Sequence, residues 1–543
     1  MSFPNFKACN KLFQLAKNPP KLTDPNFLTP QRLKSCVAES CGFKLLYGTE
    51  KITDEVLNAL IDLAKEANLI DKMKGMQNGE KVNYTDGDHT PARPALHTAV
   101  RDFFDRPNTN PVARDAAALA KKEAERMREF FQKIEKEKTF DEMIMVAIGG
   151  SDLGPRAHYL ALEYLRKPNK KVHFISNVDP DDSAHVLRQV KDFSKTLVVV
   201  VSKSGTTLET ATNEALVRNE FKKRGLNPNS HFISVTMPNT PMDNPKLYLN
   251  TFHIWEWVGG RFSTSSACGG VVLSFAYGFD IYWQMLEGAH AMDQAALNSD
   301  YRSNLPLLSA LIGIWNRNFL GYPTLAFIPY SQALYRYAAH IQQVEMESNG
   351  KLVDQRGTFI DFQTVPVVWG EPGTNAQHSF FQMLHQGTAI VPMSMIGFKE
   401  SQYNDDLIVE GTTSQEKLLA NLFAQSLALA TGQGSEDPNK VFPGNRPSHI
   451  ILGEKLTPFN LGSLLALFEH RVAFQGFLWG INSYDQEGVQ LGKVLAGKID
   501  QHFAAIRDHK KESNPYPIGD AYLEHLKSFK PHGKVEKDLA LTR

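Results

Sequence analysis

Short apolar runs that alternate with helical segments dominate the middle of this 543-residue chain. Strands that helices cover on both faces read as continuous apolar runs, because neither face meets water. The alternation therefore predicts a parallel sheet between two layers of helices, a doubly wound arrangement. The runs lie at residues 143–148, 172–176, 196–201 and 231–236, with a weaker fifth at 251–254.

A second series of runs, at residues 324–329, 389–394 and 448–452, alternates with helical segments such as 332–346 and 461–479. The length also favours more than one core, since a domain typically has about 100–200 residues. We therefore predict an α/β protein with two doubly wound α/β/α sandwich domains and mostly parallel sheets. The predicted parts are an N-terminal helical arm (1–119), a smaller domain (120–285), a larger domain (286–514) and a polar C-terminal tail (515–543).

The arm is expected to consist of helices and loops, because prolines and turn residues interrupt any strand pattern in it. Residues 116–136, rich in alanine, glutamate and lysine, predict an exposed amphipathic helix where the arm meets the first domain.

Charge and cysteine content narrow the possible partners and compartment. Lysine plus arginine equals aspartate plus glutamate at 59 each, so no overall field favours nucleic acid or an anionic membrane. No run of about 18 apolar residues is present, and we expect no membrane span. Four scattered cysteines do not form a disulfide framework or a zinc-binding pattern. We expect a cytoplasmic protein without a metal.

The sequence SKSGTT at residues 202–207 directly follows the predicted strand 196–201 and precedes a helical pattern. Unpaired N–H groups at a helix N-terminus carry partial positive charge, and short hydroxyl side chains add donors. The turn therefore predicts a cradle for the phosphate of a small molecule, with Ser202, Lys203, Ser204 and Thr207 as candidate ligands. The alternative is a hydroxyl-rich helix cap that binds nothing.

A second glycine-rich turn, Gly149-Gly150-Ser151, follows the first predicted strand. Glycines there permit close approach of the backbone to an anion or a sugar. A tight strand-to-helix turn without a ligand is the alternative. The spacing fails the GxGxxG pattern of dinucleotide-binding proteins, which argues against a dehydrogenase that uses NAD.

Four further side chains could supply chemistry, although each has an ordinary structural explanation when taken alone. Arg261 follows two glycines and could hold an oxyanion or simply pair with a surface carboxylate. Glu347 could be a base or a solvated carboxylate. A lone histidine such as His378 is more often structural than catalytic. A lysine near a helix end, such as Lys493, is common and needs no catalytic explanation.

Together these segments resemble the glucose-6-phosphate isomerase (phosphoglucose isomerase) family over nearly the whole chain. Two departures occur: Gln490 stands where the family usually has glutamate, and residues 88–91 lengthen the stretch before Arg93. The motifs occur in the family's order: IGGSDLGP, SKSGTT, VGGRFSTSSACG (258–269), MESNGK, TNAQH, GNRPS and GFLWGINSYDQEGVQLGK (476–493).

The resemblance implies reversible aldose–ketose isomerisation of glucose 6-phosphate to fructose 6-phosphate, in glycolysis and gluconeogenesis. The reaction would proceed through ring opening and a cis-enediol intermediate. Glu347 would carry the proton between C1 and C2, Arg261 would stabilise the enediolate, and His378 and Lys493 would open the ring. The substrate contacts implied are Gly150, Ser151, Ser202, Lys203, Ser204, Thr207, Gln343 and Gln486.

The family resemblance also implies a homodimer in which His378 reaches the active site of the partner subunit. No redox cofactor or metal is expected, because a proton transfer of this kind needs neither. The main rival is a noncatalytic sugar-phosphate sensor on the same fold, since a phosphate cradle by itself only binds. Such a sensor would lack the acid–base set of Glu347, Arg261, His378 and Lys493.

Overall fold

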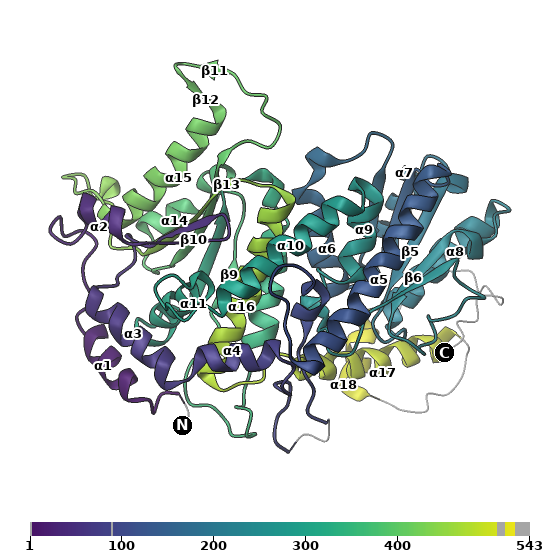
Figure 1. Ribbon diagram of the computed structural model, residues 1–543, viewed down its shortest axis with the longest axis horizontal. Helices are drawn as coiled ribbons and strands as arrows, with labels where there is room; N and C mark the ends of the chain where they lie inside the picture. The colour runs from purple at the N-terminus through teal and green to yellow at the C-terminus, as the bar shows by residue number, and fades with distance from the viewer. Residues whose placement is uncertain (1–2, 88–90, 508–515, 527–543) are drawn as a thin grey trace. The chain divides into compact units, whose positions relative to one another are not determined.

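The computed structural model describes residues 3–87, 91–507 and 516–526 (Figure 1). Two compact units divide the chain after Tyr484, and the first holds both large sheets. The second unit contains α17 (Gln490–Arg507) and α18 (Pro517–Leu523). The inserted residues 88–90 and most of the predicted tail lie outside the described residues. No helix within the described ranges is both long enough and apolar enough to cross a membrane.

The first large sheet has five strands in the order β4-β3-β5-β6-β7, and all neighbours are parallel. The chain leaves β3 to form β4 on one side and β5 on the other. The carboxyl ends of β3 and β5 are therefore the topological switch point, where open sheets of this type bind ligands. The five predicted strands are confirmed. Their bounds are β3 Glu142–Val146, β4 Lys171–Ile175, β5 Thr196–Val201, β6 Phe232–Thr236 and β7 Asn250–His253.

Alternate side chains of these strands face different layers of helices. Ile144 and Val146 pack in one cluster with residues of α7 (Pro180–Gln189) and α8 (Leu208–Lys223), and Figure 1 shows α8 beside β5 and β6. Met143 and Met145 belong to a larger core with α5 (Pro111–Lys136) and α9 (Ala267–Tyr277). Burial on both faces explains why the sequence runs are continuously apolar. The amphipathic helix predicted at 116–136 is α5.

The second large sheet has the strand order β1-β2-β13-β10-β8-β9. Its strands β13 (Ser448–Lys455), β10 (Met393–Glu400), β8 (Thr324–Pro329) and β9 (Val367–Trp369) run parallel. The chain passes from β8 to β9 on one side and then to β10 on the other. A second switch point therefore lies at the carboxyl ends of β8 and β10.

Helices also cover both faces of this second sheet. One face packs against α13 (Gly373–Gln377), α14 (Phe381–Gln386) and α15 (Ser414–Thr431). The other face packs against α11 (Leu305–Ile314), α12 (Tyr337–Gln342) and α16 (Pro458–Trp479). The predicted α/β/α layering with mostly parallel sheets is thus confirmed for both sheets.

The strand prediction missed β9, missed a hairpin in the arm and misplaced the start of β10. The N-terminal arm contains an antiparallel hairpin of β1 (Val37–Ser40) and β2 (Phe43–Leu46), which extends the second sheet by pairing with β13. The run predicted at 389–394 becomes a strand only from Met393, since Pro392 has no N–H to donate.

The remaining α-helices are α1 Lys7–Ala16, α2 Pro30–Ser35, α3 Asp54–Glu66, α4 Leu69–Gln77, α6 Gly150–Ala161 and α10 Phe279–Ala296. The strands β11 Ile408–Val409 and β12 Thr412–Thr413 form a small separate hairpin.

Two buried histidines are expected to lower the stability of the fold as the pH falls. His158 of α6 and His340 of α12 lie with ring centroids 5.9 Å apart, and both are nearly inaccessible to solvent. Burial lowers the pKa of His158 to about 4 and that of His340 to about 3. The unfolded chain takes up these protons near pH 6.5, well before the folded chain does. Acidification through the window from pH 6.5 to 4 should therefore destabilise the fold through these groups.

The substitution His340→Leu isolates this effect. The variant loses one group that binds a proton only on unfolding, so its free energy of unfolding should fall less steeply with acidification, by about 1.4 kcal/mol per pH unit in the window. Denaturant titrations of both proteins between pH 7 and 4 measure the two slopes, and groups present in both proteins cancel in the difference. Equal slopes would show that His340 is protonated in the folded protein.

Candidate functional site

The turn after β3 is built for close contact with the segment that carries Arg261. A Cβ atom on Gly150 would lie 2.4 Å from the carbonyl carbon and oxygen of Gly260 and 2.6 Å from the backbone nitrogen of Arg261, so only glycine fits there. Gly149 has φ +60°, and a Cβ on it would lie 3.8 Å from Nε2 of Gln343. The switch point of the first sheet, Arg261 and Gln343 are thus brought together. Ser151 follows as the second residue of α6.

The guanidinium of Arg261 is buried and held in one orientation. Its Nε donates to Oγ of Ser348 at 2.6 Å, and its Nη2 donates to the carbonyl oxygen of Ser483 at 2.5 Å. Its Nη1 lies 3.7 Å from Oε2 of Glu347. A buried charge of this kind must be paired and hydrogen-bonded. Arg261 and Glu347 therefore form a fixed cation–carboxylate pair beside the glycine turn.

The anchors of Arg261 are themselves fixed by a short chain of hydrogen bonds. Ser483 Oγ donates to Oδ1 of Asn349 at 2.7 Å, and Nδ2 of Asn349 donates to the carbonyl oxygen of Val472 at 3.0 Å. A Cβ on Gly476 would lie 1.9 Å from Ser483 Oγ, so the close packing here depends on that glycine. These supporting residues were not found by the sequence analysis, although Asn349 and Ser348 stand next to Glu347 in MESNGK.

Two carboxylates lie two residues apart, and the local helix geometry gives them different surroundings. The segment Gln343–Glu347 is a π-helical turn that continues α12, a feature often found at functional sites. Glu345 is fully buried, with Oε1 3.3 Å from Nε of Arg471, and burial raises its pKa. The side chain of Glu347 is 24% exposed. Of the two carboxylates, only Glu347 can meet a molecule that enters from solvent.

Gln343, at the start of the same turn, carries a buried polar atom with no partner. Its Oε1 makes no hydrogen bond among the described residues, although its Nε2 lies near Gly149. A buried acceptor without a partner is costly, so such an atom is expected to meet a donor from a ligand or water. This placement fits the prediction that Gln343 contacts substrate.

The turn between β5 and α8 gathers several hydroxyl side chains at the N-terminus of a helix. Oγ of Ser202 and Oγ1 of Thr207 lie 3.1 Å apart, and Ser204 Oγ accepts from the backbone N–H of Thr206 at 3.2 Å. Gly205 adopts φ +69°, which only glycine takes without strain. Thr207 occupies the N-cap of α8 and makes no side-chain capping bond. The N-terminal N–H groups of this 16-residue helix are thus left without a cap from Thr207.

Lys203 has a role that the sequence did not reveal. Its Nζ donates to the carbonyl oxygens of Glu256 at 2.7 Å and Val258 at 2.8 Å, which lie just before Gly259. Burial lowers the pKa of Lys203 to about 8. The side chain therefore ties the hydroxyl-rich turn 202–207 to the segment that carries Arg261. An ammonium has three donors, so one N–H remains for a ligand, and phosphate contact by Lys203 stays a prediction.

The remaining predicted residues do not join this cluster within the first unit. His378 ends α13 and is exposed, and no described hydrogen bond or ion pair joins its side chain to Glu347. Lys493 lies in α17 and Gln486 lies shortly before it, in the second compact unit. Their place in the site, like that of His378, stays a prediction.

The parallel strands β9-β8-β10-β13 of the second sheet follow the same order as β4-β3-β5-β6 of the first, and the hydroxyl-rich turn and the Arg261–Glu347 pair lie at the switch point of the first sheet. Comparison with known families is more specific. A family model, phosphoglucose isomerase, matches residues 46–515. The chain belongs to the phosphoglucose isomerase family.

Individual relatives match at least 90% of the chain. The glucose-6-phosphate isomerase of Protochlamydia amoebophila is 61% identical over 97% of this chain and 98% of its own length. That of Chlamydia pneumoniae is 52% identical over 90% of this chain and 92% of its own. The crystal structure of a glucose-6-phosphate isomerase from Chlamydia trachomatis superimposes with a TM-score of 0.93 and 45% identity, covering 98% of this chain and 100% of that one.

Proposed function

We propose that this chain catalyses the reversible isomerisation of glucose 6-phosphate to fructose 6-phosphate in glycolysis and gluconeogenesis. The family membership carries the activity, and the fixed Arg261–Glu347 pair beside an anion turn is the observation that supports its assignment to this site. A coupled assay on the purified chain tests it directly. Turnover of glucose 6-phosphate is expected. Binding without turnover would favour the alternative function of a sugar-phosphate sensor, which no observation on the described residues supports.

The chemistry follows from the placement of Glu347 and Arg261. The difficult step is removal of a weakly acidic C–H proton next to a carbonyl, which needs a positioned base and a partner for the developing negative charge. Glu347 takes the proton from C2 and returns it to C1, while the hydroxyl proton passes from O2 to O1. Arg261, permanently charged and held by Ser348 and Ser483, stabilises the enediolate without changing its own protonation.

Ring opening precedes this step, because the substrate is mostly a closed ring. We assign it to His378 and Lys493, because an imidazole can accept and donate a proton and an ammonium can donate to a ring or hydroxyl oxygen. Substrate binding falls to Gly150, Ser151, Gln343 and Gln486 around the sugar and to the hydroxyl turn 202–207 at the phosphate. Binding energy gathered at the phosphate holds C1 and C2 against the base.

If the hydroxyl groups of residues 202–207 bind the substrate phosphate, removing them should weaken the binding of phosphorylated ligands. The double substitution Ser204→Ala and Thr207→Ala removes two hydroxyl donors, each worth about 1.5–3 kcal/mol to a charged acceptor. Fructose 6-phosphate affinity should fall at least about 100-fold, and turnover should fall as well. Thr212→Ala is the matched control, since that hydroxyl of α8 donates to the carbonyl oxygen of Leu208 in its own helix. Calorimetric titration measures both, and unchanged affinity in the double variant would remove the cradle from the site.

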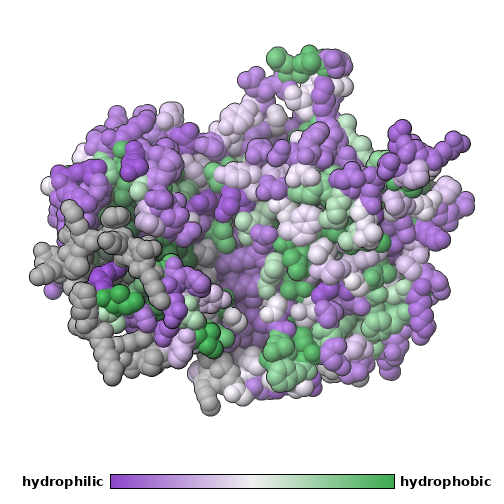
Figure 2. All heavy atoms as spheres, turned by 180° about the vertical axis from the view of Figure 1, so that it is seen from behind, coloured by the Kyte–Doolittle hydropathy of each residue, from purple (hydrophilic) through white to green (hydrophobic). Residues whose placement is uncertain are grey.

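We propose a homodimer in which His378 serves the active site of the partner subunit. The exposure of His378 supports this arrangement. So does the β11–β12 hairpin, where Leu407 and Ile408 are each 74% exposed. Figure 2 shows apolar atoms at the tip of this projecting segment. Apolar side chains gathered at such a tip are typical of a surface that another chain covers.

Mixing two inactive variants tests the shared site. In a mixed dimer of Glu347→Gln and His378→Ala chains, one of the two sites has both residues intact only if His378 acts across the interface. Random reassociation should then restore about a quarter of wild-type activity, since half the dimers are mixed and each has one good site. If His378 acted within its own chain, mixing would restore nothing.

We also propose a cytoplasmic location. All four cysteines, Cys9, Cys36, Cys41 and Cys268, are free thiols, and Cys9 and Cys268 are buried. Unpaired cysteines are typical of a reducing compartment.

A further inference from the structure

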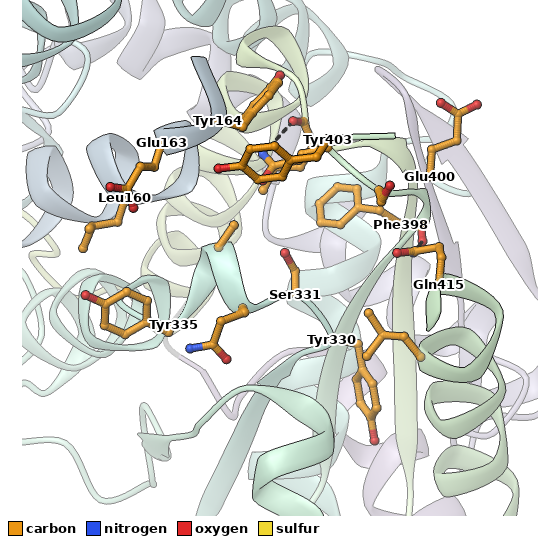
Figure 3. A pocket seen from close by; sticks show the side chains of 16 residues that line it. Leu160, Glu163, Tyr164, Tyr330, Ser331, Tyr335, Phe398, Glu400, Tyr403 and Gln415 are labelled. Atoms are coloured by element: carbon orange, nitrogen blue, oxygen red, sulfur yellow. Dashed lines mark hydrogen bonds between the residues drawn. The ribbon is translucent and has the colours of Figure 1, made fainter. Parts of the chain in front are cut away.

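A cavity of about 450 Å³ lies at the switch point of the second sheet (Figure 3). Tyr330 and Ser331, which directly follow β8, line one side of it, and residues 401–403, which directly follow β10, line another. Its volume falls in the range of small-molecule sites, about 300–1,000 Å³. The cavity therefore occupies the position in the second sheet that the phosphate turn and the Gly149–Gly150 turn occupy in the first.

The lining of this cavity does not suit a phosphate. It contains no lysine, arginine or histidine among the described residues, and it includes the carboxylates of Glu163 and Glu400. The chain after β8 forms a 3₁₀ turn and then α12 of six residues. The longer helix α15 begins at the cavity, but the backbone N–H groups of Ser414 and Gln415 in its first turn already donate to the carboxylate of Asp406. A negatively charged ligand would find carboxylates here and no cationic side chain in the described lining. The two switch points therefore select different chemistry.

The cavity instead offers acceptors and aromatic faces. Nε2 of Gln402 donates to the carbonyl oxygens of Ala161 at 2.8 Å and Leu456 at 3.0 Å, which occupies both amide hydrogens and leaves Oε1 as an acceptor. Nε2 of Gln415 is likewise turned to a backbone carbonyl, that of Phe398. The rings of Tyr164 and Tyr403 meet edge to face with centroids 6.1 Å apart, and Figure 3 places both at one end of the cavity.

We propose that this cavity binds a sugar ring that carries no phosphate. Such a ring supplies many hydroxyl donors for the oriented glutamine oxygens and for the glutamate carboxylates, and its C–H faces pack on the electron-rich faces of tyrosine rings. The site goes beyond the isomerase activity and does not depend on it, because its lining shares no residue with the phosphate turn or the Arg261–Glu347 pair.

Saturation-transfer NMR with D-glucose tests the second site while the first is filled. Saturating sorbitol 6-phosphate, which cannot be isomerised, occupies the proposed active site. Magnetisation should still pass from the protein to glucose, and added sorbitol 6-phosphate should not abolish it. Loss of all transfer once the phosphate site is filled would overturn the proposal of a second site. The coupled assay tests the proposed isomerase activity separately, so failure of one proposal does not imply failure of the other.

Substitutions at Tyr403 locate the binding. This side chain is 70% exposed, so Tyr403→Ala should fold normally, and isomerase turnover confirms that it has. Its glucose affinity should fall about 10-fold through loss of the aromatic face, whereas Tyr403→Phe should bind within about 2-fold of wild type. Phe359→Ala, which removes an equally exposed aromatic ring outside the cavity, is the control. Equal affinity in Tyr403→Ala and Phe359→Ala would contradict the proposal.

Discussion

Replacing Glu347 with glutamine should lower turnover by about 1,000-fold or more while fructose 6-phosphate binds almost as before. The amide keeps the size of the side chain and its place at the end of the π-helical turn, but it cannot accept a proton from carbon. Binding should change little, because the phosphate turn and the glycine turn are untouched. Steady-state kinetics and calorimetric titration on the same preparation separate the two effects.

The variant Glu345→Gln is the matched control for Glu347→Gln. Glu345 stands two residues earlier, fully buried against Arg471, so its replacement should reduce stability and leave the turnover of folded enzyme within about 10-fold of wild type. If Glu345→Gln abolished turnover and Glu347→Gln did not, the base would have been assigned to the wrong carboxylate.

Replacing Arg261 should have the second largest effect on catalysis. Arg261→Ala is expected to lower kcat about 100- to 1,000-fold. In other enzymes, removing one preorganised donor to a developing oxyanion lowers kcat by about that factor. Arg261→Lys should recover little of this loss. A lysine keeps the charge, but it cannot donate to Ser348 and to the Ser483 carbonyl in the planar arrangement of the guanidinium and also face Glu347.

The Arg261 experiment needs a control for general damage, because the residue is buried. Arg224→Lys changes a partly exposed arginine that pairs with Glu220 at the end of α8, and kcat should stay unchanged. Thermal unfolding of Arg261→Lys shows how much enzyme is folded at the assay temperature. A folded Arg261→Lys enzyme with wild-type kcat would show that the guanidinium is not required for charge stabilisation.

The fold was largely predictable because the buried parallel strands are local features of the sequence. The runs around Val198 and Ile144 are apolar on both faces, and no pairing partner need be known to find them. The β1–β2 hairpin was missed for the opposite reason. Each of its strands has four residues, and its pairing of Leu46 with Ile450 joins parts of the chain that are distant in sequence. Periodicity does not carry that information.

Two turns of the candidate site could be found in the sequence because they stand at strand ends. The turns at Gly150 and Ser202 stand at such ends, and the family resemblance supplied Glu347 and Arg261. The groups that orient them were not predictable. Lys203 is fixed by carbonyls of residues 256 and 258, and Arg261 by Ser348 and Ser483, contacts that only the folded chain creates.

The most direct test of the account follows a deuterium atom at C2 of glucose 6-phosphate. If one carboxylate carries the proton, part of the label should arrive at C1 of fructose 6-phosphate in the wild-type enzyme, the rest being lost to water. In Glu347→Gln the label should stay at C2 for as long as the wild-type enzyme needs to reach equilibrium. Release of the C2 deuterium by Glu347→Gln at a rate close to wild type would contradict the role given to Glu347.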